Sequence, residues 1–250
     1  MRGKIITLLS PKGGVGKTTL GRILALMLRR YDYRVAVIDC DPNRKMFKWL
    51  NFAQHEGKPF LPQMVLCPRT PEDVIDIAIS LANGGAISSE QLAGEHQSSL
   101  TVRPFDFVLI DTAGFGNQAA IYATGTTDLA LIPTGPTDDD IGDSVQAAKT
   151  VRSSSSMTKR DIAHFIVLNR VKAKTKVAEH AIGEMEKLNL PIFSDADGKP
   201  IVFEYLAPYA EMTFNRELPL HDLKARRECD RFTDAVLETL GSPKPLEHAA

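Results

Sequence analysis

The stretch from Ser10 to Thr19 holds the residues whose types and spacing most clearly predict chemistry. It reads Ser-Pro-Lys-Gly-Gly-Val-Gly-Lys-Thr-Thr and lies between an apolar run and a segment with helical periodicity. Glycines at this place let backbone N–H groups approach phosphate oxygens, because no Cβ stands in the way. Lys17 is expected to reach the β- and γ-phosphates, and the Thr18 hydroxyl is expected to ligate Mg²⁺. The predicted phosphate-binding residues are Lys12, Gly13, Gly14, Val15, Gly16, Lys17, Thr18 and Thr19.

Three carboxylates follow apolar runs further along the chain. Asp39 and Asp41 follow the run 35–38, and Asp111 follows the predicted strand 105–110, which is apolar from Phe107 onward, and precedes Thr-Ala-Gly. Ligands of open α/β sheets bind at the carboxyl ends of the strands, which is where these aspartates are predicted to lie. Asp111 is therefore a candidate Walker B carboxylate that holds Mg²⁺ mainly through the water shell of the ion. The alternatives are that Asp111 caps the following turn and that Asp41-Pro42 only ends a strand.

The pattern Lys-Gly-Gly-x-Gly-Lys-Thr-Thr resembles the deviant Walker A motif of the ParA/MinD family of P-loop ATPases. Pro11 stands where the ordinary motif has its first glycine, and Lys12 is an additional lysine. The resemblance implies that Lys12 reaches across a dimer interface to the nucleotide of the other subunit. The alternative is that Lys12 is a solvated charge beside an anionic ligand.

The same resemblance extends to Asp39-x-Asp41-Pro42, which is similar to the first switch of the family. It implies that Asp39 lies near the Mg²⁺ shell and that Asp41 orients or activates the attacking water. Phosphoryl transfer depends mostly on positioning and electrostatics, and an acceptor in line with the leaving group fits that requirement. Asn43 is a mild departure, because the family often has glutamine after the proline.

Asn169 and Arg170 follow another apolar run and are predicted to contact the nucleotide base. An amide at position 169 could meet the adenine edge, as residues at this place do in the family, or could simply form a turn. The run Asn-Arg-Val-Lys lacks the aspartate of the guanine-reading signature Asn-Lys-x-Asp. ATP is therefore favoured over GTP as the nucleotide.

Alternating strand and helix signals predict one α/β domain over residues 1–250, with a doubly wound, mostly parallel sheet and a short disordered tail from about 241. This is the P-loop NTPase fold. Strands are expected at 4–9, 35–38, 63–67, 105–110, 129–133, 163–168 and 201–203, and helices at 17–30, 43–57, 70–83, 138–152, 176–188 and 221–240. Residues 84–104 read as a polar loop with one short helix near Glu90, and the serines 153–156 as part of a connection.

Composition narrows the class of protein. The chain has 43% hydrophobic residues, a formal net charge of −1 and three cysteines that form no Cys-x-x-Cys pair. No run approaches the length of a membrane span, and the N-terminus lacks the apolar region of a signal peptide. The scattered cysteines do not predict a disulfide framework, a zinc site or an iron–sulfur cluster. These features predict a cytoplasmic location.

Basic residues are unevenly distributed despite the near-neutral total. The segment 149–176 has a single acid among its basic residues, which are Lys149, Arg152, Lys159, Arg160, Arg170, Lys172, Lys174 and Lys176. The last predicted helix adds Lys224, Arg226, Arg227 and Arg231. Such stretches are usually solvated surface, but ParA-type dimers bind DNA without sequence preference through basic residues late in the chain. Binding of that kind depends on phosphate contacts and on salt.

The resemblance as a whole favours the ParA-like branch. It implies a slow ATPase, stimulated by a partner, that uses Mg²⁺ and forms an ATP-bound sandwich dimer on DNA. A ParB-like or other small activator would trigger hydrolysis and release, in partition of a plasmid or chromosome or in positioning of a cargo, with nucleoid association in the ATP state. Two alternatives remain: a small-molecule phosphotransferase or amidoligase, with an acceptor pocket formed by residues 84–104, and a MinD-like membrane-associated ATPase. The second is disfavoured because the chain ends without a terminal amphipathic helix.

Overall fold

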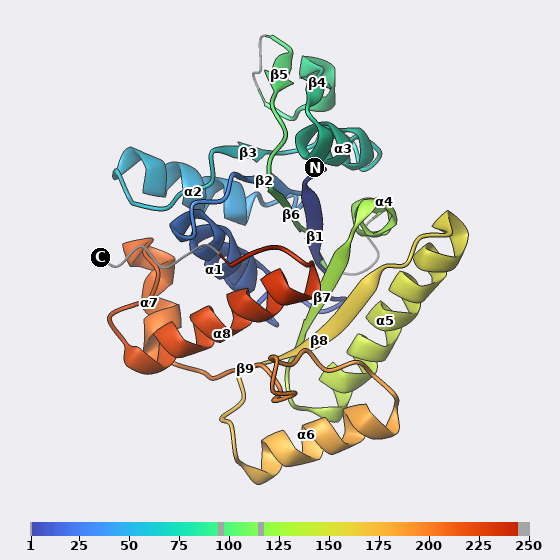
Figure 1. The fold of residues 1–250 in the computed structure, drawn as a ribbon, viewed down its shortest axis with the longest axis vertical. Helices are drawn as coiled ribbons and strands as arrows, with labels where there is room; N and C mark the ends of the chain where they lie inside the picture. Colours follow the sequence, from blue (N-terminus) through green and yellow to red (C-terminus); the bar gives the residue numbers. More distant parts are fainter. Residues whose placement is uncertain (1, 95–97, 115–117, 245–250) are drawn as a thin grey trace.

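The structure is a computed structural model that describes residues 2–94, 98–114 and 118–244. A seven-stranded sheet has the order β3-β2-β6-β1-β7-β8-β9, and every pair of neighbouring strands in it is parallel. Its strands are β1 Lys4–Leu8, β2 Val35–Asp39, β3 Met64–Leu66, β6 Phe107–Asp111, β7 Leu129–Thr134, β8 Ala163–Asn169 and β9 Val202–Phe203. The predicted doubly wound, parallel architecture is confirmed (Figure 1).

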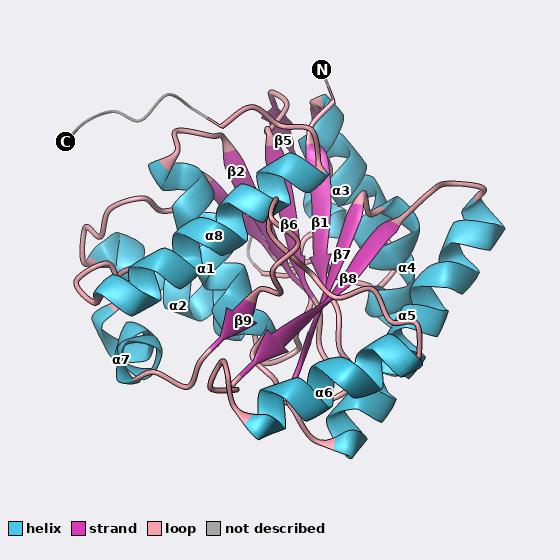
Figure 2. Ribbon diagram, turned by 60° about the horizontal axis from the view of Figure 1, so that its bottom comes forward, coloured by secondary structure: helices cyan, strands magenta, loops and turns pink. Residues whose placement is uncertain are grey.

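Eight α-helices connect and cover these strands in the described part of the chain. They are α1 Lys17–Arg30, α2 Lys45–His55, α3 Asp73–Asn83, α4 Gln118–Thr126, α5 Asp138–Thr158, α6 Lys176–Lys187, α7 Ala207–Asn215 and α8 Leu223–Thr239. Alternate strand residues face opposite helical layers, so that the central strands β1, β6 and β7 are apolar apart from Thr7 and their end residues. Helices α1, α2, α7 and α8 cover one face, and α3, α4, α5 and α6 cover the other. Figure 2 shows the strands in the middle of the molecule with helices on both sides.

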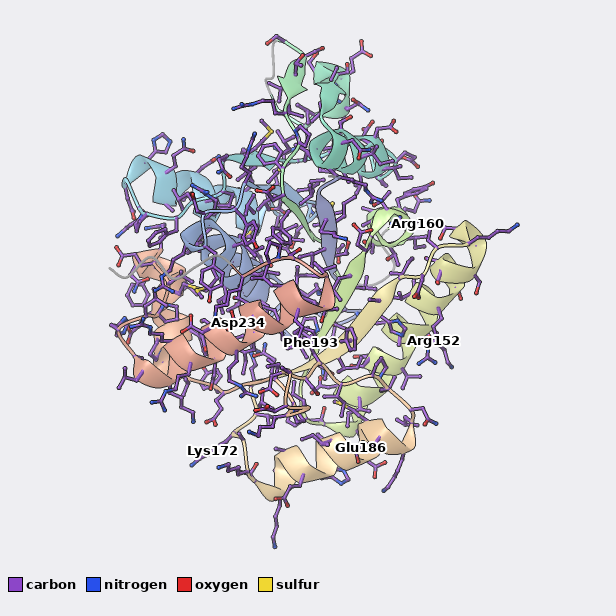
Figure 3. The ribbon with its side chains drawn as sticks, in the orientation of Figure 1. Arg152, Arg160, Lys172, Glu186, Phe193 and Asp234 are labelled. Atoms are coloured by element: carbon purple, nitrogen blue, oxygen red, sulfur yellow. The ribbon has the colours of Figure 1, made fainter. Side chains whose placement is uncertain are left out.

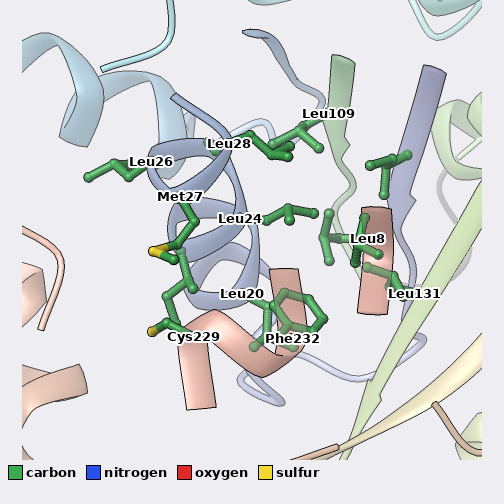
Figure 4. Packing of buried hydrophobic residues seen from close by; sticks show 14 of the residues in the cluster. Leu8, Leu20, Leu24, Leu26, Met27, Leu28, Leu109, Leu131, Cys229 and Phe232 are labelled. Carbon is green, nitrogen blue, oxygen red and sulfur yellow. The ribbon is translucent and has the colours of Figure 1, made fainter. Parts of the chain in front are cut away.

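The largest core cluster lies between the sheet and α8, with α1 in the middle. Leu20, Leu24 and Leu28 of α1 are almost fully buried and contact apolar side chains of β1, β6 and β7 (Figure 4). Phe232 of α8 closes this cluster from the other side. Because α1 begins directly after the glycine-rich stretch, this packing fixes that stretch on the sheet.

Two expectations about the elements are wrong, and two helices were missed. Helix α5 continues through the serines 153–156 and ends at Thr158, with Ser156 and Thr158 hydroxyls donating to carbonyls four residues earlier. The segment 84–104 contains an antiparallel pair, β4 Gly85–Ile87 and β5 Leu100–Val102, in addition to the expected short helix, which is the 3-10 helix Ser89–Gln91. Helices α4 and α7 were not predicted. In Figure 1 the β4–β5 pair, a sheet of its own, projects beside α3, away from the seven-stranded sheet.

Residues 241–244, assigned from the sequence to the start of a tail, contact the body of the protein. Ser242 N–H donates to the carbonyl of Leu237, the Tyr33 hydroxyl donates to the carbonyl of Pro243, and Lys244 pairs with Asp234 at 2.8 Å. The remaining residues of the predicted tail, 245–250, lie outside the described residues.

Candidate nucleotide-binding site

The glycine-rich stretch forms the turn between β1 and α1, at the carboxyl edge of the sheet. Gly14 and Gly16 have φ of +82° and +103°, which a side chain would disfavour. A Cβ on Gly16 would lie 2.0 Å from Nδ2 of Asn169, and that amide donates to the carbonyl of Val15 at 2.6 Å. The close approach of β8 to the loop therefore requires glycine at position 16.

Lys17 occupies the first turn of α1 and folds back over the loop. Its Nζ donates to the carbonyls of Ser10 and Lys12, at 3.2 and 2.9 Å, and the residue is only 8% exposed. Burial lowers the pKa of the ammonium, and Asp111 and Asp41 oppose that shift. No acidic residue lies in the first turn of α1, so the positive end of the helix and the ammonium both favour a bound anion.

Asp39 and Asp111 end neighbouring strands and are directly opposite each other in the register of β2 and β6. Thr18 Oγ1 donates to Oδ2 of Asp111 at 2.8 Å, while Oδ1 of Asp111 is buried without a hydrogen-bond partner among the described residues. Burial, reinforced by Asp39, raises the pKa of Asp111 to about 7. Burial likewise raises the pKa of Asp39. An unpartnered buried oxygen and two carboxylates that resist ionisation fit a site for a cation.

Magnesium suits this donor set. The described residues contain no cluster of three or more His, Cys, Asp or Glu side chains arranged around one ion. Mg²⁺ commonly binds through one or two protein oxygens, several waters and the phosphates of a substrate. The hydroxyl of Thr18 and the carboxylates of Asp39 and Asp111 supply such oxygens on one side of the phosphate loop.

Asp39 and Asp41 shape the turn that leads into α2. Asp39 accepts the N–H of Asp41 at 3.0 Å and the N–H of Phe47 at 2.8 Å, so it ties this turn to the first part of α2. Asp41 is partly exposed, and its Oδ1 accepts both the N–H and the side-chain amide of Asn43. The asparagine after the proline therefore orients Asp41 at the carboxyl edge of the sheet.

Arg22 is a member of this site that the sequence analysis missed. It is 8% exposed, its Nη2 donates to the carbonyl of Lys45 at 3.0 Å, and its guanidinium lies 4.6 Å from the centre of the Trp49 ring. Burial lowers its pKa to about 10, although Asp111 and Asp39 favour the charged form. A charged residue in the otherwise apolar face of α1, one turn after Thr18, is the signal that could have revealed it.

Lys12 is held by a different element from the rest of the loop. Its Nζ pairs with Oδ1 of Asp140 at 2.7 Å, and its side chain is 46% exposed. Asp140 lies in the first turn of α5, where it also forms a capping box with Thr137. The hydrogen bond to Asp140 raises the pKa of Lys12, so the ammonium is charged at pH 7.

A pocket of about 200 Å³ continues from the loop toward β8 and α7. Asn169 and Arg170 line it from one side, and Glu204, Tyr205 and Leu206 line it from the other. Both polar ends of the Asn169 amide bond to backbone, with Nδ2 donating to Val15 and Oδ1 accepting the N–H of Arg170. The contact of Asn169 and Arg170 with a base stays a prediction, and the segment 204–213 was not predicted to take part.

Comparison with known proteins identifies the family. Residues 6–196 match the model of the CobQ/CobB/MinD/ParA nucleotide-binding domain. The chain belongs to this family. ParA and MinD proteins are nucleotide-binding ATPases, and the similarities below lie mainly with the ParA-like branch.

Relatives by sequence include proteins named for partition and for cargo distribution. A probable plasmid-partitioning protein ParA of Thermus thermophilus is 26% identical over 94% of this chain and 78% of its own. A protein ParA of Rhizobium radiobacter is 24% identical over 70% of this chain and 68% of its own. The maintenance of carboxysome distribution protein A of Gloeothece citriformis is 25% identical over 60% of this chain and 64% of its own.

Solved structures share the fold at lower identity. The ATP complex of Cyanothece McdA aligns with a TM-score of 0.68 and 18% identity, over 98% of this chain and 99% of the other. The Pyrococcus horikoshii MinD structure with Mg-ADP aligns with a TM-score of 0.62 and 16% identity, over 94% and 95% of the two chains. These likenesses confirm the P-loop NTPase fold.

The basic residues of this ParA/MinD-family chain do not form one surface, contrary to their grouping in the sequence. Arg170, Lys172, Lys174 and Lys176 follow β8 at the nucleotide edge. Lys149, Arg152, Lys159 and Arg160 lie on or just after α5, and Figure 3 shows Arg152 and Arg160 far from Lys172. The reason is that β8 runs the full depth of the sheet between the two groups.

Membrane association was disfavoured from the sequence. In the portion of the chain that the structure describes, no helix is both long enough and apolar enough to cross a bilayer.

Proposed function

We propose that the protein is a ParA-like ATPase that works as a nucleotide-gated dimer on DNA. ATP binding closes a sandwich of two subunits, the dimer binds DNA without sequence preference, and a ParB-like or other small activator stimulates slow hydrolysis and release. The cycle serves partition of a plasmid or chromosome, or positioning of a cargo, in the cytoplasm and on the nucleoid in the ATP state. The observation that carries the proposal is Lys12, a loop lysine whose exposed ammonium bonds outside its own phosphate cradle.

Within one subunit, the loop N–H groups and Lys17 bind the phosphate chain. Thr18, Asp39 and Asp111 hold Mg²⁺, which supplies neutralisation of the charge that develops on the phosphate oxygens. Asp41, oriented by Asn43, holds the attacking water in line with the bond that breaks. Lys12 of the second subunit adds a positive charge from the opposite side, in the manner of an arginine finger.

The pair between Lys12 and Asp140 makes this second contribution conditional. In the single subunit the two groups are 2.7 Å apart, so Lys12 is already bonded. A charge-assisted hydrogen bond to a phosphate oxygen can replace the bond to Asp140 only when a nucleotide in a second subunit is close. Because Lys12 exchanges Asp140 for a phosphate oxygen only across the subunit interface, formation of the dimer depends on bound nucleotide.

The DNA surface that we propose is the basic loop after β8, defined here as Lys172, Lys174 and Lys176. All three side chains are exposed, and no ion pair within 4.0 Å joins any of them to a carboxylate among the described residues, although Lys172 lies close enough to Glu204 to help lower the pKa of that carboxyl. On α8, by contrast, Lys224 pairs with Glu204 at 2.5 Å and Arg231 with Asp195 at 2.6 Å. Unpaired ammonium groups are those that can release the counterions of DNA phosphates.

Fluorescence anisotropy with a labelled duplex of arbitrary sequence tests the proposal. Binding should require ATP and Mg²⁺, be absent with ADP, and weaken steeply as salt rises. The triple alanine variant of the basic loop should bind about tenfold or more weakly with a shallower salt dependence. The matched control is the triple alanine variant of Lys149, Arg152 and Lys159, on and just after α5, which should bind normally. Equal binding of DNA with ATP, with ADP and without nucleotide would contradict the proposal that ATP controls DNA binding.

A further inference from the structure

A second cleft, of about 340 Å³, lies at the carboxyl ends of β2 and β3. We call it the β2–β3 cleft. The turn after β2 contributes Cys40, Pro42 and Arg44, the turn after β3 contributes Cys67 and Arg69, and Ala93 covers it from the β4–β5 segment. No residue of the phosphate loop or of the base pocket lines it. Asp39 and Asp41 belong to both, so the cleft adjoins the nucleotide site, but the nucleotide site does not account for Arg44, Arg69 or the two thiols.

The lining is that of a small-molecule site. Prolines, alanines and two thiols supply an apolar surface, and burial raises the pKa of Cys67 to about 12, so that thiol is neutral at pH 7. Two guanidinium groups, of Arg44 and Arg69, supply positive charge, and the carboxylates of Asp39 and Asp41 supply negative charge. Ligand pockets commonly have volumes of about 300–1,000 Å³ and combine an apolar lining with a few placed polar groups.

The two arginines have no carboxylate partner among the described residues. Arg69 bonds to backbone only, with Nε donating to the carbonyl of Leu92 at 3.2 Å and Nη2 to that of Ser89 at 3.4 Å. Arg44 precedes α2, whose first turn has no acidic residue and whose N-terminus has no side-chain cap. Asp39 and Asp41 also line the cleft, but their oxygens already accept backbone N–H groups. Neither carboxylate forms an ion pair with Arg44 or Arg69, so both guanidinium groups keep hydrogen-bond donors for a ligand.

The β4–β5 segment holds in place the side of the cleft that the turn after β3 forms. Arg69 N–H donates to the carbonyl of Gln91 at 2.8 Å, and Ala93 N–H donates to the carbonyl of Cys67 at 2.9 Å. Together with the side-chain bonds of Arg69, these contacts hold the turn after β3 against the 3-10 helix. A guanidinium held in this way loses little freedom when an anion binds it.

From this juxtaposition we propose that the β2–β3 cleft binds a small organic anion, whose carboxylate or phosphate group lies between Arg44 and Arg69 and whose apolar part rests on the prolines and thiols. The proposal goes beyond the proposed ATPase cycle: the cleft shares Asp39 and Asp41 with the nucleotide site, but the two arginines that would hold the anion belong to neither the phosphate loop nor the magnesium site.

Isothermal titration calorimetry on the full chain, with ADP and Mg²⁺ saturating the nucleotide site, tests the proposal. Succinate and glycerol 3-phosphate are the probes for a carboxylate and a phosphate, and succinamide is the uncharged control. Saturable binding of either anion, with none of succinamide, is expected. The anion that binds with the higher affinity identifies whether the cleft prefers a carboxylate or a phosphate group.

Variants locate the binding. Arg44→Gln and Arg69→Gln should each weaken it about tenfold or more. Ala93→Leu, which fills the cleft without changing its charge, should abolish it. The matched control is Arg103→Gln, an exposed arginine just after β5 that does not line the cleft. Melting curves of all variants separate loss of folding from loss of the site. Absence of saturable binding by both anions, or an equal loss in Arg103→Gln, would overturn the proposal.

Discussion

Asp41 illustrates how one side chain can separate binding from hydrolysis. It lies at the edge of the site, half-exposed, and bonds to Asn43 rather than to the loop or to Thr18. Asp41→Ala should therefore leave the affinity for ATP nearly unchanged and lower turnover by about 100-fold or more, because the water loses its acceptor. Binding of a fluorescent ATP analogue and phosphate release measure the two quantities. Normal phosphate release would remove Asp41 from the mechanism.

Asp140 is the residue that restrains Lys12. Asp140→Asn removes the negative charge but keeps an oxygen for Thr137, so the ammonium of Lys12 should leave α5 more readily. The ATP-dependent dimer is expected to tighten several-fold in sedimentation experiments. Asp139→Asn, one residue earlier and exposed, removes an equal charge without touching that hydrogen bond and is the control. An unchanged dimer in Asp140→Asn would show that the pair does not restrain Lys12.

At the scale of elements, the contact between β8 and the loop after β1 decides the shape of the site. Gly16→Ala combines a φ of +103° with a Cβ placed 2.0 Å from the Asn169 amide. It should destabilise the protein by about 1–3 kcal/mol and weaken nucleotide binding. Gly13→Ala is the comparison, because a Cβ there meets nothing within 4 Å and its φ is not positive. Equal unfolding free energies of the two variants in chemical denaturation would refute this account of Gly16.

Glu228 of α8 connects α7 to the end of β9 beside the pocket that Asn169 and Arg170 line. Its Oε2 accepts the Tyr209 hydroxyl at 2.8 Å and the N–H of Glu204 at 3.3 Å. Burial raises the pKa of Glu228, so the folded state holds its proton more tightly than the unfolded state does. The stability that the protonated group contributes is present below its unfolded pKa and is lost as pH rises through the folded one.

Glu228→Gln removes this titration while keeping an acceptor for Tyr209. The difference in unfolding free energy between the variant and the natural protein should therefore move in favour of the variant as pH rises from about 4 to 8. Urea denaturation across that range measures it. A difference that does not change with pH would contradict a raised pKa at Glu228.

The elements also show what the sequence could predict. The strands that end in Asp39 and Asp111 were predicted because continuous apolar runs followed by an acid mark the edge of a parallel sheet. Helix α7 escaped because it is short and mostly exposed, with one fully buried side chain, Met212. The Lys12–Asp140 pair escaped because its partners are 128 residues apart, and no local pattern encodes such a contact.

At the scale of the whole molecule, the chain places its nucleotide loop, both switch aspartates, Lys12 and the basic loop on one edge of the sheet. Parallel strands bring their carboxyl ends together, so the fold alone gathers groups from positions 12 to 176. A second subunit that meets this edge would meet all of them. The dimer is therefore the feature on which the account of function depends.

The most direct test is the oligomeric state of Lys12→Ala in a protein that also carries Asp41→Ala, so that bound ATP is not hydrolysed during the measurement. Light scattering after size exclusion, with Asp41→Ala present in both proteins, compares the two with ATP and Mg²⁺ and with ADP. The account predicts a dimer with ATP and a monomer with ADP when Lys12 is present, and a monomer in both nucleotides when Lys12 is alanine. An ATP-dependent dimer that forms equally well without Lys12 would contradict it.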